Sequence, residues 1–207
     1  MAGTLVVLDW SGGASSLVSG RELAGFSVDS LLMTDVPSNG NELAEAFRQA
    51  VLARVQVILC DLEPADIAVV EGDAEDFLDA TVVYITGDEP AGEAKHIGQS
   101  KYDACNTNAA DEAIVWGGAI ATRVGAAAFD EWVNAIANTA AHEVGHTLGF
   151  VHPTEEIVGS PLPLPADELM RADVTVSDLL MERWFVIEQD TCPEDPEQSY
   201  HLADGNP

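Results

Sequence analysis

The sequence predicts an α+β fold in a single domain, and three observations support this. Short runs of β-branched and apolar residues, bounded by turn signals, recur up to Trp116. Two longer segments space their apolar residues three and four apart, the pattern of a helix with one buried face. The chain becomes irregular after Pro153, where further prolines interrupt any regular pattern. We therefore expect a larger N-terminal lobe of strands and helices and a small irregular C-terminal lobe that ends in a helix.

Four apolar segments have the length and composition of strands. They are Thr4–Trp10, Val55–Cys60, Thr81–Thr86 and Ala113–Trp116. Glycine-containing turns follow the first, third and fourth of them, which fits the ends of buried strands. The polar stretch Lys95–Asp103 has a weaker pattern and is a candidate for a short edge strand.

Three segments are expected to be helical. The first runs from Asn41, whose side chain can cap a helix, to about Arg54. The second is the long amphipathic segment 130–148. The third lies within Val176–Ile187, with Ser177 as its expected cap.

Charge excludes two classes of partner. The 207 residues include 8 Lys and Arg against 36 Asp and Glu, so the formal net charge is −28. So few cations cannot follow a phosphate backbone or bind an anionic membrane, and we expect neither nucleic acid nor membrane as a partner. The acids are spread along the chain, which favours a hydrated, salt-tolerant (halophilic-like) surface over a cation site or a basic partner. The same charge would bias a cleft toward basic peptides.

The N-terminus and the cysteines say little about the compartment. The first residues lack the basic region of a signal peptide, so we expect a cytoplasmic protein if the chain is complete and an extracellular one if it is a trimmed form. Cys60, Cys105 and Cys192 allow either one disulfide with one free thiol or three reduced thiols. None of them is spaced like a zinc ligand.

Three of the five histidines lie in one short segment, which reads HEVGHTLGFVH from His142 to His152. Residues four apart on a helix point in nearly the same direction and lie one turn apart. His142 and His146 can therefore bind one metal ion from the same helix face. Glu143 can then reach a water molecule on that ion without binding the ion itself.

His152 can join this site only if the helix ends before it, because on a continued helix it would point roughly 120° away. Gly149 lies between, and glycine readily adopts the left-handed conformation that ends helices. Three neutral imidazoles suit Zn²⁺ and leave a fourth position for water, so we expect one catalytic zinc ion. A chance match at these five positions is on the order of one in 50,000 for this composition, which makes an incidental core helix a poor explanation.

These residues resemble the HExxHxxGxxH signature of the metzincin clan of zinc metallopeptidases, and Pro153 after the third histidine is similar to the serralysin pattern. The resemblance implies a zincin-like fold, with a twisted mixed β-sheet and helices up to about residue 149 and a lower lobe from about 150 to 207. It implies that His142, His146 and His152 bind zinc and that Glu143 is the general base. The chain would then be a minimal serralysin- or matrixin-like catalytic domain, a metalloendopeptidase.

Metzincins also have a methionine turn beneath the metal. Met170 is the candidate, because it follows the proline-rich segment and precedes the last expected helix. Met181 is the rival, although it lies within a helical pattern and is expected to pack in the core. Two features depart from relatives in the clan. Ala172 occupies the position of the tyrosine ligand of astacins and serralysins, and the paired cysteines of archaemetzincins are absent.

The resemblance also implies how a peptide would bind. Lys95–Asp103 would be the edge strand that pairs with an extended peptide, and Gly159–Leu169 would shape the pocket for the side chain after the scissile bond. We expect a peptide or protein substrate and a monomeric enzyme.

Two alternatives come from other function classes. One is a zinc-binding recognition module without peptidase activity. The other is an acidic interaction or calcium-binding protein in which the histidines are incidental. An oxygen-rich loop could hold Ca²⁺, although a solvated turn explains it as well; its residues are Asp103, Asn106, Asn108 and Asp111.

Overall fold

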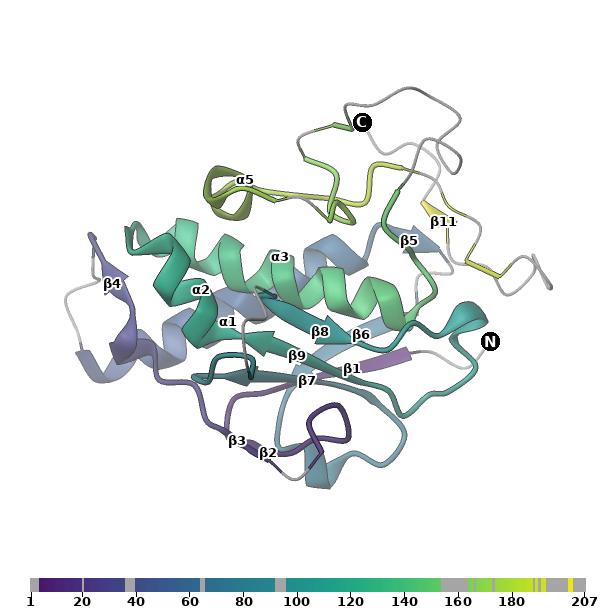
Figure 1. Cartoon of the computed structure of the whole chain (residues 1–207), viewed down its shortest axis with the longest axis horizontal. Coiled ribbons are helices and arrows are strands. Elements are labelled where there is room, and N and C mark those ends of the chain that lie inside the picture. Colours follow the sequence, from purple (N-terminus) through teal and green to yellow (C-terminus); the bar gives the residue numbers. More distant parts are fainter. Residues whose placement is uncertain are drawn as a thin grey trace.

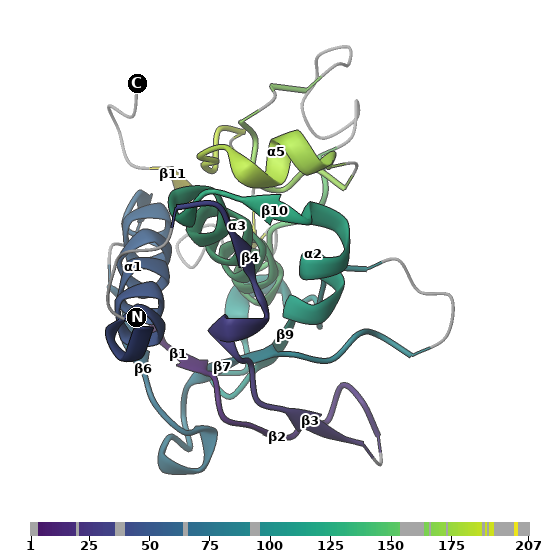
Figure 2. The same cartoon turned by 90° about the vertical axis from the view of Figure 1, so that its left-hand side faces the viewer.

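The computed structural model describes residues 4–19, 21–35, 40–63, 66–91, 96–153, 164–165, 167–172, 174–187, 189, 191–192 and 201–202. These residues form layers around a twisted mixed sheet (Figures 1 and 2). Two long helices, α1 and α3, cover one face of the sheet, and a short hairpin covers the opposite face. The segment that contains α5 lies on the far side of α3 from the sheet.

The sheet has five strands in the order β6-β1-β7-β9-β8. Their bounds are β1 Thr4–Asp9, β6 Ile67–Glu71, β7 Thr81–Thr86, β8 Gly98–Ser100 and β9 Glu112–Trp116. β6, β1, β7 and β9 are parallel, whereas β8 runs antiparallel to β9 at the edge. The sequence predictions for β1, β7 and β9 and for an edge strand within 95–103 are confirmed, apart from Lys95 itself, which lies outside the described residues.

Side chains of the central strands alternate between two cores, as the period of two along a strand requires. On β1, Val6 and Leu8 face the helices while Val7 faces the hairpin side. On β7, Val83 packs with the helix layer and Val82 with the hairpin side. Burial on both faces explains why these strands are nearly continuous apolar runs.

The predicted strand Val55–Cys60 is wrong, because α1 runs from Gly40 to Leu59. Its buried side chains continue the helical spacing beyond Arg54, through Val55, Ile58 and Leu59, so the β-branched residues remain on the helix face that packs against the sheet. Propensity favoured a strand there, but burial of a continuous apolar stripe outweighs propensity. Asn41 lies inside the helix rather than at its cap, and the short strand β5 and then β6 follow the helix.

α3 spans Phe129–Thr147 and is the central helix of the molecule. It contacts α1, β8, β9 and α5, and most of its side chains are buried. The helix prediction is confirmed to within a residue at each end.

The smaller elements surround this framework. β2 Gly12–Ala14 and β3 Glu22–Ala24 form the hairpin, β4 Leu32–Met33 pairs with β10 Ala126–Ala127, and β5 Leu62–Glu63 pairs with β11 His201–Leu202. The remaining elements are α2 Gly117–Val124 and three 3₁₀ turns at Val28–Ser30, Ala74–Asp76 and Ala104–Asn106.

The C-terminal part differs from the prediction. α5 covers only Val176–Leu180, and its cap is Thr175, whose hydroxyl accepts the backbone N–H of Asp178, rather than Ser177. The helix stops because the backbone is extended at Met181, where the amide of Asn138 on α3 donates to the Met181 carbonyl (2.8 Å). The lobe therefore does not end in a helix, since the strand β11 follows α5.

Of the two cysteine states that the sequence allowed, the structure has one disulfide and one free thiol. Cys105 and Cys192 are bonded across 87 positions, and Cys60 is exposed. The bond fastens the C-terminal segment to the loop that follows β8. No helix in the described part of the chain has both the length and the apolar character to cross a membrane.

Candidate metal centre

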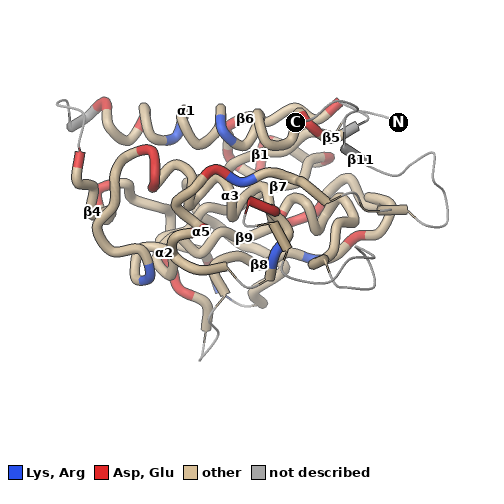
Figure 3. Tube along the Cα trace, turned by 90° about the horizontal axis from the view of Figure 1, so that it is seen from above, with Lys and Arg blue, Asp and Glu red and all other residues tan. Residues whose placement is uncertain are grey.

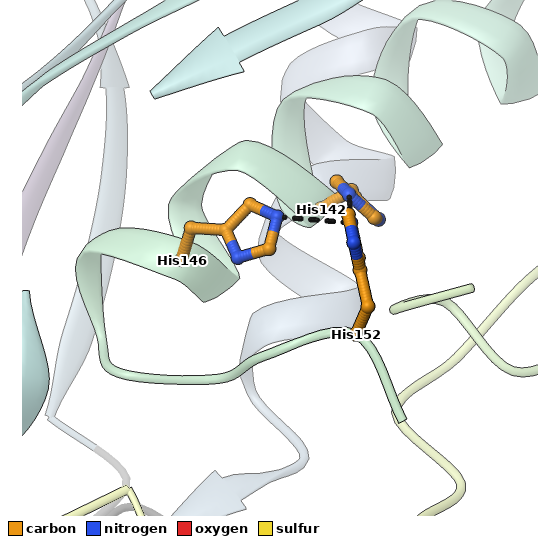
Figure 4. A group of neighbouring side chains, drawn as sticks. All are labelled: His142, His146 and His152. Carbon is orange, nitrogen blue, oxygen red and sulfur yellow. Dashed lines mark hydrogen bonds between the residues drawn. The ribbon is translucent and has the colours of Figure 1, made fainter. Parts of the chain in front are cut away.

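Three histidines converge at the C-terminal end of α3 (Figure 4). His142 and His146 project from the same side of the helix, and His152 comes from the chain that follows it. The Nε2 atom of His152 lies 3.2 Å from the Nε2 atoms of both His142 and His146. Among the described residues, these histidines are the one group of three or more His, Cys, Asp or Glu side chains that could hold a metal ion.

The turn after α3 brings His152 back to the site. Gly149 has φ +95°, a left-handed conformation that glycine adopts without strain. The backbone N–H of Phe150 donates to the Gly145 carbonyl (2.9 Å), which closes the end of the helix. A Cβ on Gly149 would also lie 2.6 Å from the Thr191 carbonyl oxygen, so this position has neither the conformation nor the space for a side chain.

Backbone carbonyls fix the orientation of two of the imidazoles. Nδ1 of His142 lies 2.8 Å from the Leu169 carbonyl, and Nδ1 of His146 lies 2.8 Å from the Phe150 carbonyl. A carbonyl can only accept, so each Nδ1 carries the proton and each Nε2 presents a lone pair to the centre. Backbone carbonyls holding the outer nitrogens of metal-binding histidines are a common arrangement in zinc sites.

This donor set fits a zinc ion. Converging lone pairs repel one another, and His152 can relieve only one of its two 3.2 Å contacts by donating a proton. Tetrahedral zinc with nitrogen ligands at about 2.0–2.1 Å separates those nitrogens by about 3.3 Å, close to the observed distances. A cation among the three Nε2 atoms would turn the repulsion into coordination.

Burial also favours the neutral, metal-binding form of the imidazoles. Burial, followed by the nearby charge of His146, lowers the pKa of His142 to about 3. The pKa values of His146 and His152 are lowered as well, again mainly by burial. Neutral imidazole is the form that binds metals, so protons do not compete for these nitrogens at neutral pH.

Glu143 faces the same space from the adjacent helix position. It is 7% exposed, and burial raises its pKa to about 7, although a hydrogen bond from Ser100 opposes the shift. The hydroxyl of Ser100 on β8 donates to Oε2 of Glu143 at 2.6 Å. A Cβ at Gly98 would overlap the same carboxylate. β8 therefore holds the Glu143 carboxylate through Ser100 and leaves space for it at Gly98.

The turn at Met170 lies directly beneath the histidines. Met170 is fully buried, and a Cβ on Gly145 would lie 2.7 Å from its Sδ atom. The preceding residue supplies the carbonyl that binds His142. Met181, in contrast, is 39% exposed at the end of α5, so its expected place in the core is wrong.

Sequence reasoning missed the residue that builds this turn. Glu168 is fully buried, and its carboxylate accepts the backbone N–H groups of Met170 (2.8 Å), Val186 (2.9 Å) and Ile187 (2.7 Å). Ser100 was missed as well. Its contact with Glu143, like the contacts of Glu168 with Val186 and Ile187, joins segments that are far apart in the chain. The one signal in the sequence was a glutamate two residues before the candidate methionine.

In the loop suggested for calcium, several carboxylate oxygens already accept hydrogen bonds from groups of the same loop. The Asp103 carboxylate accepts the hydroxyl of Thr107 (2.7 Å) and the backbone N–H of Asn108 (2.8 Å). The Asn108 amide donates to Asp111 (2.9 Å), and burial raises the pKa of Asp111 to about 6. Asn106 binds Thr4 through its amide (3.3 Å). Nothing here tests calcium binding, which stays a prediction.

A cavity of about 680 Å³ opens beside the histidines. It extends along α3 past Asn138 and Thr139, which lie about one turn before His142. It is bounded by β8 on one side and, on the other, by Arg171, Ala172, Val174, Leu179 and Arg183. Gly159–Pro163 and Ala166, within the segment expected to shape this pocket, lie outside the described residues. The cavity therefore opens onto the histidines and Glu143 together.

Comparison with known proteins gives weak matches only. No protein-family profile and no curated protein sequence matches the chain. Among solved structures, the archaemetzincin of Methanopyrus kandleri matches at 13% identity with a TM-score of 0.46, covering 87% of this chain and 86% of that chain. The archaemetzincin of Archaeoglobus fulgidus, in a complex with malonate, matches at 12% identity with a TM-score of 0.42, covering 94% and 99%. These values assign no family.

Proposed function

We propose that the chain is a zinc-dependent endopeptidase of the metzincin type, with a zincin-like fold and one catalytic domain. One observation carries this proposal: three imidazole Nε2 atoms converge beside a buried carboxylate at the wall of an open cavity. His142, His146 and His152 hold the zinc. Met170 is the methionine of the turn beneath it, because it packs against the helix between the first two ligands.

The residues of the site divide the chemistry among them. Bound zinc lowers the pKa of water and polarises a peptide carbonyl. Glu143 accepts a proton from the attacking water and delivers it to the leaving amine, a role that suits a carboxyl group with a pKa near neutral. Ser100 holds the carboxylate through one oxygen, which leaves the other free to face the water. The carbonyls of Leu169 and Phe150 keep the imidazoles in the zinc-binding tautomer.

β8 is where a peptide would pair. It is the edge strand of the sheet, it borders the cavity, and it contacts Glu143 directly. A peptide added along this edge would lie across the histidines with its scissile carbonyl within reach of the site. Strand addition recognises the backbone, so it suits an enzyme that cleaves within extended chains.

The proposal is tested by Glu143→Gln, which keeps the shape of the side chain and removes its basicity. We expect the variant to retain zinc and to lose at least about 100-fold of the wild-type activity on unfolded protein, because general acid–base catalysis typically contributes 10²–10⁴-fold. Glu22→Gln on the exposed hairpin strand β3 is the matched control and should keep full activity. Chelation should abolish activity in the wild type and in the control.

Two outcomes would overturn the proposal. Wild type and Glu143→Gln could bind zinc and be equally inert on a broad peptide library, which would make the chain a zinc-binding recognition module. Alternatively, the purified protein could hold no zinc, which would favour an acidic interaction or calcium-binding protein with incidental histidines.

A further inference from the structure

The cavity beside the histidines has the opposite charge to the rest of the molecule. Acidic residues are spread over the described chain and basic residues are few (Figure 3). Yet the cavity is lined by three of the eight Lys and Arg residues, Arg123, Arg171 and Arg183. Among the described lining residues, Glu143 is the one carboxylate, although the chain has 36 acids. The charged side chains that line the cavity therefore differ in sign from the net charge of −28.

Arg183 is the central member of this group. It is 2% exposed, and within the described part of the chain no carboxylate lies within ion-pair distance of it. Its guanidinium donates to the backbone carbonyl of Glu168, while its Nε atom has no hydrogen-bond acceptor. The Glu168 carboxylate is occupied by three backbone N–H groups instead. A buried cation without a directly paired carboxylate is costly, so an anion in contact with Arg183 would stabilise it.

Charges of both signs act on Arg183. Burial, followed by the charge of Arg171, lowers the pKa of its guanidinium, whereas the charges of Asp178, Glu168 and Asp167 raise it, although none of these carboxylates lies within ion-pair distance. Arg123 lies in the last turn of α2 and lines the same cavity; it is exposed and makes no ion pair with the described carboxylates. An anion between these side chains would relieve the repulsion and accept hydrogen bonds from guanidinium groups, which suit carboxylates.

The walls of the cavity limit what the anion can be. Val174 and Leu179 supply apolar surface, and the buried Oδ1 atom of Asn138, which lacks a hydrogen-bond donor, can accept a peptide N–H but cannot bind the carboxylate. The arginines line the same cavity as His142 and Glu143. A carboxylate on a short apolar stem, attached to a peptide that pairs with β8, matches this combination of apolar wall and cationic end.

We propose that this cavity selects peptides with an aspartate or glutamate side chain beside the scissile bond, with Arg183 as the principal counterion and Arg123 and Arg171 as supporting cations. The proposal rests on the proposed peptidase function and adds the substrate class. It assigns a specificity role to arginines that no part of the hydrolysis itself requires.

The test uses paired peptides that differ only in the two residues beside the scissile bond, each varied through Asp, Asn, Ala and Lys. Cleavage is followed by mass spectrometry. We expect Asp over Asn by about 10- to 100-fold in kcat/KM at one of the two positions, the range for a charge-assisted contact of about 1.4–2.8 kcal/mol. Lys should be the poorest residue there. Equal rates for Asp and Asn, or a preference for Lys, would overturn the proposal.

Arginine variants locate the effect. Arg183→Gln should reduce the Asp preference to less than about threefold while cleavage of the Ala peptide persists, and Arg183→Lys should keep part of the preference. Arg123→Gln at its exposed position should weaken the preference without loss of folding, which covers the case in which Arg183 variants fail to fold. Arg48→Gln on α1, which does not line the cavity, is the matched control and should leave the Asp preference unchanged. An unchanged preference in both Arg123→Gln and a folded Arg183→Gln would contradict the assignment.

A binding experiment separates this proposal from the peptidase function. The Glu143→Gln variant is titrated with the same fluorescent peptides, and anisotropy reports binding without turnover. Tighter binding of Asp than of Asn peptides, with no cleavage by the wild type, would uphold the acidic-ligand cavity and reject the peptidase. Cleavage by the wild type without any Asp preference in rate or binding would do the reverse.

Discussion

Gly149→Ala tests why the third histidine reaches the other two. The left-handed backbone at φ +95° costs a residue with a side chain about 1–3 kcal/mol. The added Cβ would also lie 2.6 Å from the Thr191 carbonyl oxygen, and such overpacking costs about 1–3 kcal/mol more. The variant should therefore lose about 2–4 kcal/mol of stability, although the backbone can relax part of the strain.

The assay combines thermal unfolding with zinc affinity. For a chain of this size, 1 kcal/mol changes Tm by about 2–4 °C, so a fall of about 5–15 °C is expected. Zinc affinity should fall by about 10- to 100-fold, because His152 follows directly from the displaced turn. Gly125→Ala is the matched control: its φ is also positive (+70°), but no atom lies within 4 Å of the added Cβ.

The control should show only the backbone cost, with a smaller fall in Tm and an unchanged zinc affinity. If Gly149→Ala and Gly125→Ala behaved alike in both measurements, the tight contact with Thr191 would have no role in positioning His152. If Gly149→Ala kept the wild-type Tm, the described turn itself would be wrong.

Three further predictions concern other parts of the molecule. Ser100→Ala removes the hydrogen bond to the Glu143 carboxylate; kcat should fall about tenfold with zinc content unchanged, and wild-type kcat would refute a positioning role. Reducing the Cys105–Cys192 bond should cost about 2–4 kcal/mol by releasing the C-terminal segment; unfolding curves with and without reductant measure this, with Cys60→Ser as a control that should not change Tm. A net charge of −28 predicts that Tm rises between about 0.1 and 1 M NaCl as repulsion is screened, and a falling Tm would reject the salt-tolerant surface.

Local patterns in the sequence predict most of the elements near the site. The strands β1, β7 and β9 and the helix α3 follow from apolar runs and from helical spacing, because their burial is continuous. The errors lie where tertiary contacts decide. Val55–Leu59 is helical because its apolar face packs on the sheet. α5 is cut short at Met181 because an amide on α3 takes the carbonyl there.

The candidate site shows the same division. The spacing of the HEVGHTLGFVH segment places the histidines and the carboxylate, since these four residues lie on one helix and the turn that follows it. Ser100, Glu168 and Arg183 are absent from any such pattern, because they reach the site through contacts between distant segments. The charge of the cavity lining could not be predicted either. Net charge describes the whole chain, whereas the lining contains only three arginines and one glutamate among its described residues.

Zinc K-edge X-ray absorption on the purified protein, together with its metal content, shows whether the three histidines bind zinc. We expect one zinc per chain bound by three imidazole nitrogens at about 2.0–2.1 Å, with an oxygen as the remaining ligand. His152→Ala should lose one of these nitrogens. Less than about half an equivalent of zinc, or sulfur ligands at about 2.3 Å, would contradict a three-histidine catalytic site.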